Sequence, residues 1–184
     1  MTIDDARALM HQWVSSAALR THMECVAACM GAYAAQTEPD QAQRWRVCGM
    51  LHDMDWEKHP TREEHPFVAV KFLRERGDVD DEILTAILGH AEYSGTPRVT
   101  PMARTLFAVD ELAGFIVACA KVRPDGVATL EPKSVKKKLK AKEFAAAVSR
   151  ADIATGIAEL GVDEGAHIQT CIDAIRGERE RLGV

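Results

Sequence analysis

The chain has 184 residues, a hydrophobic fraction of 47% and a formal net charge of −5 at pH 7. An acidic chain lacks the basic surface that nonspecific nucleic-acid binding requires, so nucleic acid is a disfavoured partner. The hydrophobic fraction suffices for a packed core, no apolar run approaches the ~20 residues of a membrane-spanning helix, and Met1–Asp5 opens acidic rather than as a signal peptide. We therefore expect a cytoplasmic globular protein without a membrane partner.

The chain carries an odd number of cysteines and no Cys-x-x-Cys pair; they are Cys25, Cys29, Cys48, Cys119 and Cys171. Four of the five fall in apolar stretches with helical spacing. We expect small buried thiols in a reducing cytoplasm, and neither a disulfide framework nor a cysteine-based zinc site.

Apolar residues recur at helical spacing along almost the whole chain, and no stretch alternates long enough to predict a strand. Ser15–Ser16 can cap the first expected helix, which breaks at Thr37–Asp40. The expected elements that follow are a helix through 45–51, a helix from Pro66 ended by Gly77, a helix started by acidic residues 80–82, a turn at 94–97, a long helix from Pro101, a turn at 123–126, a helical stretch over 133–150, and a last helix capped by Asp163.

The fold class that this pattern predicts is all-α, as a compact irregular helical bundle. We expect one principal domain over residues 1–125. Residues 126–184 are expected to form a helical extension that packs on this domain rather than folding alone.

Several histidines and aspartates fall on the apolar faces of the expected helices. His22 lies three residues after Leu19 and four before Val26. His90 lies three residues after Ile87, and Asp110 four after Leu106. The pair His52-Asp53 ends an apolar run, so it should emerge where the core meets a cleft.

A carboxylate on a buried helix face is unfavourable unless it is paired or binds a metal. One inward histidine is more often a hydrogen-bonded core residue than a ligand. Two inward aspartates together with several inward imidazoles favour a shared divalent cation. Imidazole nitrogen and carboxylate oxygen suit Mn, Fe, Co, Ni or Zn, with Mg as a further option.

The order His22, His52-Asp53, Asp110 resembles the HD superfamily of metal-dependent phosphohydrolases, whose signature is a His, an adjacent His-Asp pair and a distal Asp. The string Gly49-Met50-Leu51-His52-Asp53 is similar to the family's apolar run that ends in His-Asp. The resemblance covers about residues 15 to 125, and the later part is similar to an extension found in small bacterial members. It implies a helical fold of the HD type.

The resemblance also implies a ligand set and a reaction. A first ion would be held by His22, His52, Asp53 and Asp110. A second would be held by His65 and His90, with Asp53 as a bridging carboxylate. The implied reaction is hydrolysis of a phosphoester by metal-activated water, with Asp53 in the catalytic centre. Asp55 is a candidate for orienting that water or acting as general base, and its alternative is a surface or helix-end aspartate.

Phosphate recognition needs cations beyond the metal, and the candidates are Arg123, Lys133 and Lys136. The last two belong to the strongest basic run in the chain, Lys133–Lys140. One interpretation is a phosphate-binding lip over the site, and the other is an ordinary solvated helix face. The favoured substrate is a small phosphorylated metabolite, with a nucleotide preferred.

Two alternatives stay open. The same ligand order is similar to the HD-fold diiron oxygenases, which cleave carbon bonds with dioxygen. The chain can also be a non-catalytic helical module that binds a metal or a nucleotide. Substrate, metal, ion number and oligomeric state are not fixed by the sequence, although part of the helical surface is a candidate for pairing two subunits.

Overall fold

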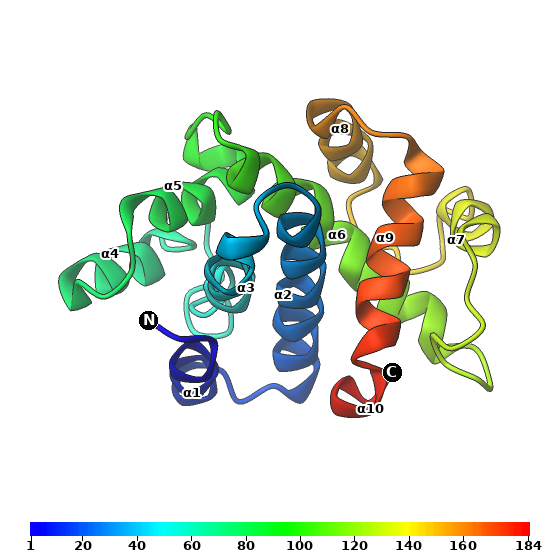
Figure 1. The fold of residues 1–184 in the computed structure, drawn as a ribbon, viewed down its shortest axis with the longest axis horizontal. Helices are drawn as coiled ribbons and strands as arrows, with labels where there is room; N and C mark the ends of the chain where they lie inside the picture. Colours follow the sequence, from blue (N-terminus) through cyan, green and yellow to red (C-terminus); the bar gives the residue numbers. More distant parts are fainter.

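The computed structural model describes residues 1–184 and contains ten α-helices, two short 3₁₀ helices and no strand (Figure 1). The prediction of an all-α fold is confirmed. The elements are α1 (Ile3–Trp13), α2 (Ala17–Thr37), η1 (Pro39–Gln41), α3 (Ala42–Leu51), α4 (Phe67–Arg76), α5 (Asp81–His90), η2 (Glu92–Ser94), α6 (Pro101–Lys121), α7 (Pro132–Leu139), α8 (Arg150–Leu160), α9 (Glu164–Gly177) and α10 (Arg179–Leu182).

Side-chain caps set most of the helix starts. Ser16 caps α2 by accepting from the Leu19 amide, and Asp163 caps α9 in the same way. Asp80 caps α5, which leaves acidic residues in the first turn of that helix as expected. Gly77 ends α4 in the left-handed region at φ 76°, where glycine is favoured. The sequence patterns therefore located these boundaries correctly.

The apolar helices α2 and α6 form the centre of the molecule (Figure 1). Helix α2 packs against α3, α6 and α9, and α6 also packs against α5 and α8. Helices α2 and α3 approach closely at Gly49, where an added Cβ would lie 2.8 Å from the Cα of Ala27. This close crossing places the His22 helix beside the His52 helix.

The stretch 133–150 differs from its prediction of one helix. Helix α7 ends at Leu139, and turns follow until Ser149 caps α8. The Arg150 guanidinium donates to backbone carbonyls of Ala145 and Val148, and also to that of Phe144. These bonds satisfy acceptors that a continuous helix would have used, so the turn segment is stabilised without helical hydrogen bonds.

The C-terminal helices pack on the rest of the chain. Helix α8 lies so close to α6 that a Cβ on Gly156 would fall 2.6 Å from the Cα of Ala108. Helix α9 contacts the same residue of α6: its buried His167 ring accepts from the Tyr33 hydroxyl at 2.5 Å and donates to the Ala108 carbonyl at 3.0 Å. The division of the chain near residue 125 stays a prediction.

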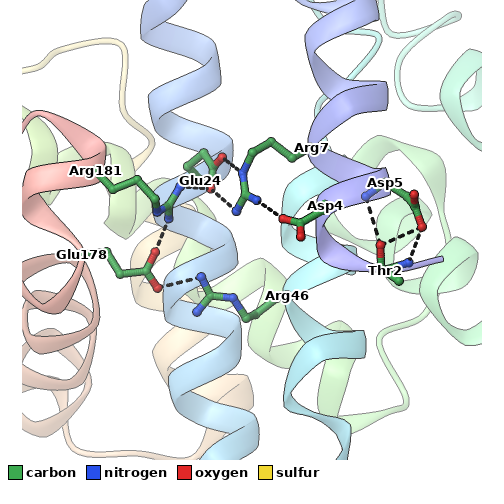
Figure 2. Close-up of polar contacts among 8 residues, drawn as sticks. All are labelled: Thr2, Asp4, Asp5, Arg7, Glu24, Arg46, Glu178 and Arg181. Carbon is green, nitrogen blue, oxygen red and sulfur yellow. Dashed lines mark hydrogen bonds and ion pairs between the residues drawn. The ribbon is translucent and has the colours of Figure 1, made fainter.

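A chain of ion pairs joins the C-terminal end to α1, α2 and α3 (Figure 2). The Glu24 carboxylate, 7% exposed, accepts from Arg7 Nε at 2.6 Å and from Arg181 Nη1 at 2.5 Å. Arg181 also contacts Glu178, which accepts from Arg46 Nη2 at 2.6 Å. The buried carboxylate on α2 thus links the first and last helices of the molecule.

Two expectations from composition remain: that the cysteine thiols are buried, and that no helix spans a membrane. All five cysteines are buried and none is paired with another. None of the helices combines the length and the apolar character that crossing a bilayer requires.

Candidate metal centre

Six histidine and aspartate side chains from five parts of the chain meet at one place. His22 comes from α2, His52 and Asp53 follow α3, and His65 lies in the turn before α4. His90 is the last residue of α5, and Asp110 lies in the middle of α6. The structure therefore brings together all six residues that the sequence nominated as metal ligands.

The first ligand group combines His22, His52, Asp53 and Asp110. The Nε2 atoms of His22 and His52 lie 3.3 Å apart. Asp110 Oδ1 is 3.0 Å from His22 Nε2 and 3.3 Å from His52 Nε2. Asp53 Oδ2 is 3.8 and 3.6 Å from the same two nitrogens. Two nitrogens and two carboxylate oxygens thus face a common centre.

The second ligand group combines His65, His90 and the other oxygen of Asp53. The Nε2 atoms of the two histidines lie 3.2 Å apart. Asp53 Oδ1 is 3.4 Å from His65 Nε2 and 3.3 Å from His90 Nε2. Asp53 therefore presents one oxygen to each group, in the arrangement of a bridging ligand.

These separations fit a cation. Four ligand atoms bonded tetrahedrally at about 2.1 Å lie about 3.4 Å from one another. The nitrogen–nitrogen and nitrogen–oxygen separations in both groups run from 3.0 to 3.8 Å. Little rearrangement is needed for His22, His52 and Asp53, or for Asp53, His65 and His90, to close around an ion, and Asp110 lies within reach of the first of these groups.

The hydrogen bonds behind the rings explain why the cluster suits a cation. His52 Nδ1 donates to the Gly49 carbonyl at 2.8 Å, and His90 Nδ1 donates to the Ile87 carbonyl at 2.5 Å. In a neutral imidazole held in this way, Nε2 carries a lone pair and no hydrogen. When His52 and His90 are neutral, lone pairs of nitrogen and carboxylate oxygen therefore converge at the centre. A divalent cation satisfies this acceptor-only cluster.

The pKa values in the metal-free protein follow from the same crowding. Burial disfavours the charged form of His52, but Asp53 and Asp110 outweigh it and raise its pKa to about 9. Burial alone would raise the pKa of Asp110, yet the neighbouring His52 and His22 hold it well below its ordinary value. Without metal, a proton on His52 thus partly compensates the two carboxylates.

The centre opens into a cleft of about 1360 Å³. His22, Asp53 and Asp110 contribute to its wall and stay 15–21% exposed, whereas the His52 ring is fully buried. The other cleft residues on which the following arguments rest are three arginines, three aromatic residues and four acids: Arg62, Arg98, Arg104, Trp56, Tyr93, Phe107, Glu92, Glu111, Asp152 and Glu159. Helix α8 contributes Asp152 and Glu159, so it forms part of the wall.

Asp55 lies behind the centre rather than in the cleft. Its side chain is fully buried, with Oδ1 accepting from His65 Nδ1 at 2.7 Å and Oδ2 accepting from the Ala69 amide at 2.8 Å. Both oxygens are engaged and the residue does not line the cleft. This placement suits a residue that orients the His65 ring, and it does not favour the expected contact with a reacting water.

The three candidate phosphate ligands lie away from the cleft. Lys133 pairs with Glu131 at 2.7 Å, and Lys136 pairs with Glu164 at 3.0 Å. Arg123 donates to Thr129 and lines a separate cavity near the end of α6. The structure does not bring these side chains to the metal centre, so the basic run forms no lip over it.

The sequence analysis missed the cleft arginines and Glu111. Arg62, Arg98 and Arg104 stand alone in the sequence without a basic run, and only the packing of α5, α6 and the connecting turns makes them neighbours. Glu111 is adjacent to Asp110, which was a usable signal. Burial and then the charges of Asp110 and Asp152 raise the pKa of Glu111 to about 7, while its Oε2 accepts from the Ser149 amide.

Comparison of the chain with known proteins shows to which protein family it belongs. The family model described as HD domain matches residues 19–114, slightly more than half of the chain. No curated protein matches the chain, and no solved structure matches it. The matched span contains the complete His/Asp cluster, from His22 to Asp110. The chain therefore belongs to the HD domain family, which is of the metal-dependent phosphohydrolase type.

Proposed function

We propose that the protein is a metal-dependent phosphohydrolase that cleaves a phosphoester of a small metabolite, with a nucleotide as the favoured substrate. The observation that carries this proposal is the pair of His/Asp groups that share Asp53 at the wall of an open cleft. A purely structural metal site is closed by its protein ligands, whereas this one faces solvent space.

Each part of the centre has a defined task. His22, His52, Asp53 and Asp110 would hold one divalent ion, and Asp53, His65 and His90 a second. Such ions supply Lewis acidity, which polarises a phosphoryl group and lowers the pKa of a coordinated water. The Gly49 and Ile87 carbonyls fix the His52 and His90 rings so that Nε2 faces the ions.

Glu111 is the cleft group that can deliver a proton to a leaving oxygen. In the metal-free protein, burial, and after it the charge of Asp110, raises its pKa to about 7, so it keeps a proton there more readily than an ordinary carboxyl. The Ser149 amide occupies Oε2, so Oε1 is the atom left to carry that proton toward the cleft. Its neighbour Asp110 places it beside the first ligand group.

The charge of the cleft makes anion binding depend on the metal. Asp53, Asp110 and four further acids line it, against three arginines. A phosphorylated substrate would be repelled by the metal-free cleft. Divalent ions reverse this balance, so substrate and metal binding should be coupled.

The test combines metal analysis with activity. Protein purified without chelator or metal-binding tag should contain one or two divalent ions per chain and hydrolyse phosphomonoesters, including nucleoside monophosphates. Chelation should abolish the activity, and Asp53→Ala should lose both metal and rate. Asp40→Ala removes an exposed carboxylate far from the cluster and should change neither. Activity that survives chelation and Asp53→Ala would overturn the proposal.

The shared Asp53 and the two histidines of the second group also suit the diiron oxygenase alternative. Oxygen uptake by iron-loaded protein in the presence of substrate would favour it, whereas hydrolysis with no oxygen uptake would exclude it. Saturable nucleotide binding with neither hydrolysis nor oxygen uptake would favour the non-catalytic module.

A further inference from the structure

The three arginines of the cleft are not equivalent. Arg98 donates from two nitrogens to Glu159, at 2.6 and 2.7 Å, and its guanidinium lies 3.7 Å from the centre of the Phe107 ring. Arg104 donates a hydrogen bond to the Arg98 carbonyl. The pKa of Glu159 is lowered first by its hydrogen bond from Arg98 and then by the charges of Arg98 and Arg104. Arg98 is thus paired with the acidic wall of the cleft, and Arg104 is held by the backbone of Arg98.

The Arg62 side chain differs from those of Arg98 and Arg104. It makes no hydrogen bond or ion pair with any other residue, and its guanidinium lies over the Tyr93 ring at 5.3 Å from the centre. The aromatic face holds the cation without neutralising its charge. The Arg62 guanidinium is therefore free to bind an anion.

Two unusually exposed aromatic rings flank the second ligand group on the same side. Trp56 follows Asp53 by three residues, is 43% exposed, and its ring lies 4.9 Å from the His65 ring. Tyr93 follows His90 by three residues and is 41% exposed. Both rings line the cleft. Burial raises the pKa of Tyr93, and the charges of Asp53 and Asp55 raise it further. Two partly exposed rings thus lie beside the second ligand group.

We infer that Trp56, Arg62 and Tyr93 form a substrate subsite that selects phosphoesters carrying a planar aromatic group. This inference rests on the proposed function and adds the class of group attached to the phosphate. The Arg62 guanidinium binds a phosphate oxygen, and the two rings stack on the planar group. An aliphatic phosphoester finds the same cation and the same ions but gains no stacking.

Two ligands of equal charge separate these contributions: phenyl phosphate and n-butyl phosphate. Binding to the manganese-loaded protein is measured by isothermal titration calorimetry, or as KM if the ligand is hydrolysed. We expect phenyl phosphate to bind about fivefold more tightly than n-butyl phosphate, from the usual size of aromatic pair interactions. Trp56→Leu and Tyr93→Leu should each reduce this preference. Equal affinity of the wild-type protein for the two ligands would overturn the aromatic selection.

A separate variant tests the contact between Arg62 and the phosphate group. Arg62→Gln should weaken the binding of both ligands by about tenfold and keep their ratio, because a charge-assisted hydrogen bond to phosphate is lost. The matched control Arg74→Gln removes an exposed arginine of α4 outside the cleft and should leave both affinities unchanged. Metal content should equal that of the wild type in every variant. Unchanged binding in Arg62→Gln would overturn the role of Arg62.

The outcome separates the subsite from the reaction. If both ligands bind in the expected order but are not hydrolysed, the subsite stands and the proposed hydrolysis fails. If both are hydrolysed without preference and without a response to Arg62→Gln, the hydrolysis stands and the subsite fails.

Discussion

The contact of α2 with α3 at Gly49 gives a quantitative test of how the fold positions the metal centre. An alanine Cβ at this position would lie 2.8 Å from Ala27 Cα, 2.9 Å from Ala27 N and 3.0 Å from the Val26 carbonyl carbon. Carbon atoms in contact are normally about 3.5–4.0 Å apart. All three neighbours are backbone atoms of α2, so no side chain can rotate away and the two helices must separate.

The magnitude follows from two opposing effects of Gly49→Ala. Overpacking of a rigid contact costs about 3 kcal/mol, at the upper end of the usual range, because only backbone can move. Replacing a helical glycine by alanine returns about 1 kcal/mol of helix propensity. We therefore expect the metal-free variant to lose about 2 kcal/mol of unfolding free energy.

The same displacement reaches the metal ligands. The Gly49 carbonyl accepts from His52 Nδ1, and His22 stands on the opposing helix with its Nε2 3.3 Å from that of His52. Moving α3 away from α2 stretches this pair, so metal affinity should fall together with stability.

The assay is urea unfolding of the metal-free protein, followed by a metal titration at a pH where both proteins are folded. Gly177→Ala is the matched control, because Gly177 lies in a helix and no atom is within 4 Å of its added Cβ. That variant should be as stable as the wild type or slightly more stable. The reasoning is refuted if Gly49→Ala is no less stable than the wild type or binds metal as tightly.

Four further predictions concern the centre and its support. Asp55→Asn should weaken binding of the second ion by about 10–100-fold and retain the first, because an amide offers one acceptor oxygen where the carboxylate serves two donors, His65 Nδ1 and the Ala69 amide. Elemental analysis checks this, and two tightly bound ions would contradict it. The apparent metal affinity should rise by up to about tenfold for each pH unit below pH 9. The cation must displace the proton that Asp53 and Asp110 hold on His52 against the effect of burial. A competition titration across pH measures the slope, and a flat profile would be inconsistent with this. Glu111→Gln should lower kcat by about 100-fold without loss of metal, and an unaltered kcat would remove its role as proton donor. Glu24→Gln should lower the free energy of unfolding, measured in urea, by about 2 kcal/mol. The loss is smaller than for a fully buried pair because the side chains of Arg7 and Arg181 are 28% and 39% exposed. Unchanged stability would show that the ion-pair chain contributes little.

Much of the secondary structure followed from local patterns in the sequence. The six metal-ligand candidates followed from those patterns together with the resemblance to the HD superfamily, and His65 from the resemblance alone. Apolar spacing and caps such as Ser16 and Asp163 act within one helical turn, so they can be recognised without tertiary information. The inward faces of His22, His90 and Asp110 follow from the same periodicity. The helix expected over 133–150 failed because the Arg150 side chain binds backbone carbonyls two to nine residues before it, which a continuous helix would have used.

The chemistry around the ligands depended on long-range packing. Asp55 stands two residues from Asp53, yet only the docking of α4, through the Ala69 amide, turns its carboxylate away from the cleft and onto His65. Lys136 belongs to the strongest basic run, but α7 packs near α9 and pairs it with Glu164. Arg62 carries no local signal at all. A sequence specifies which side chains face inward on each helix, whereas the crossing of helices decides which of them share a cleft and which charges remain unpaired there.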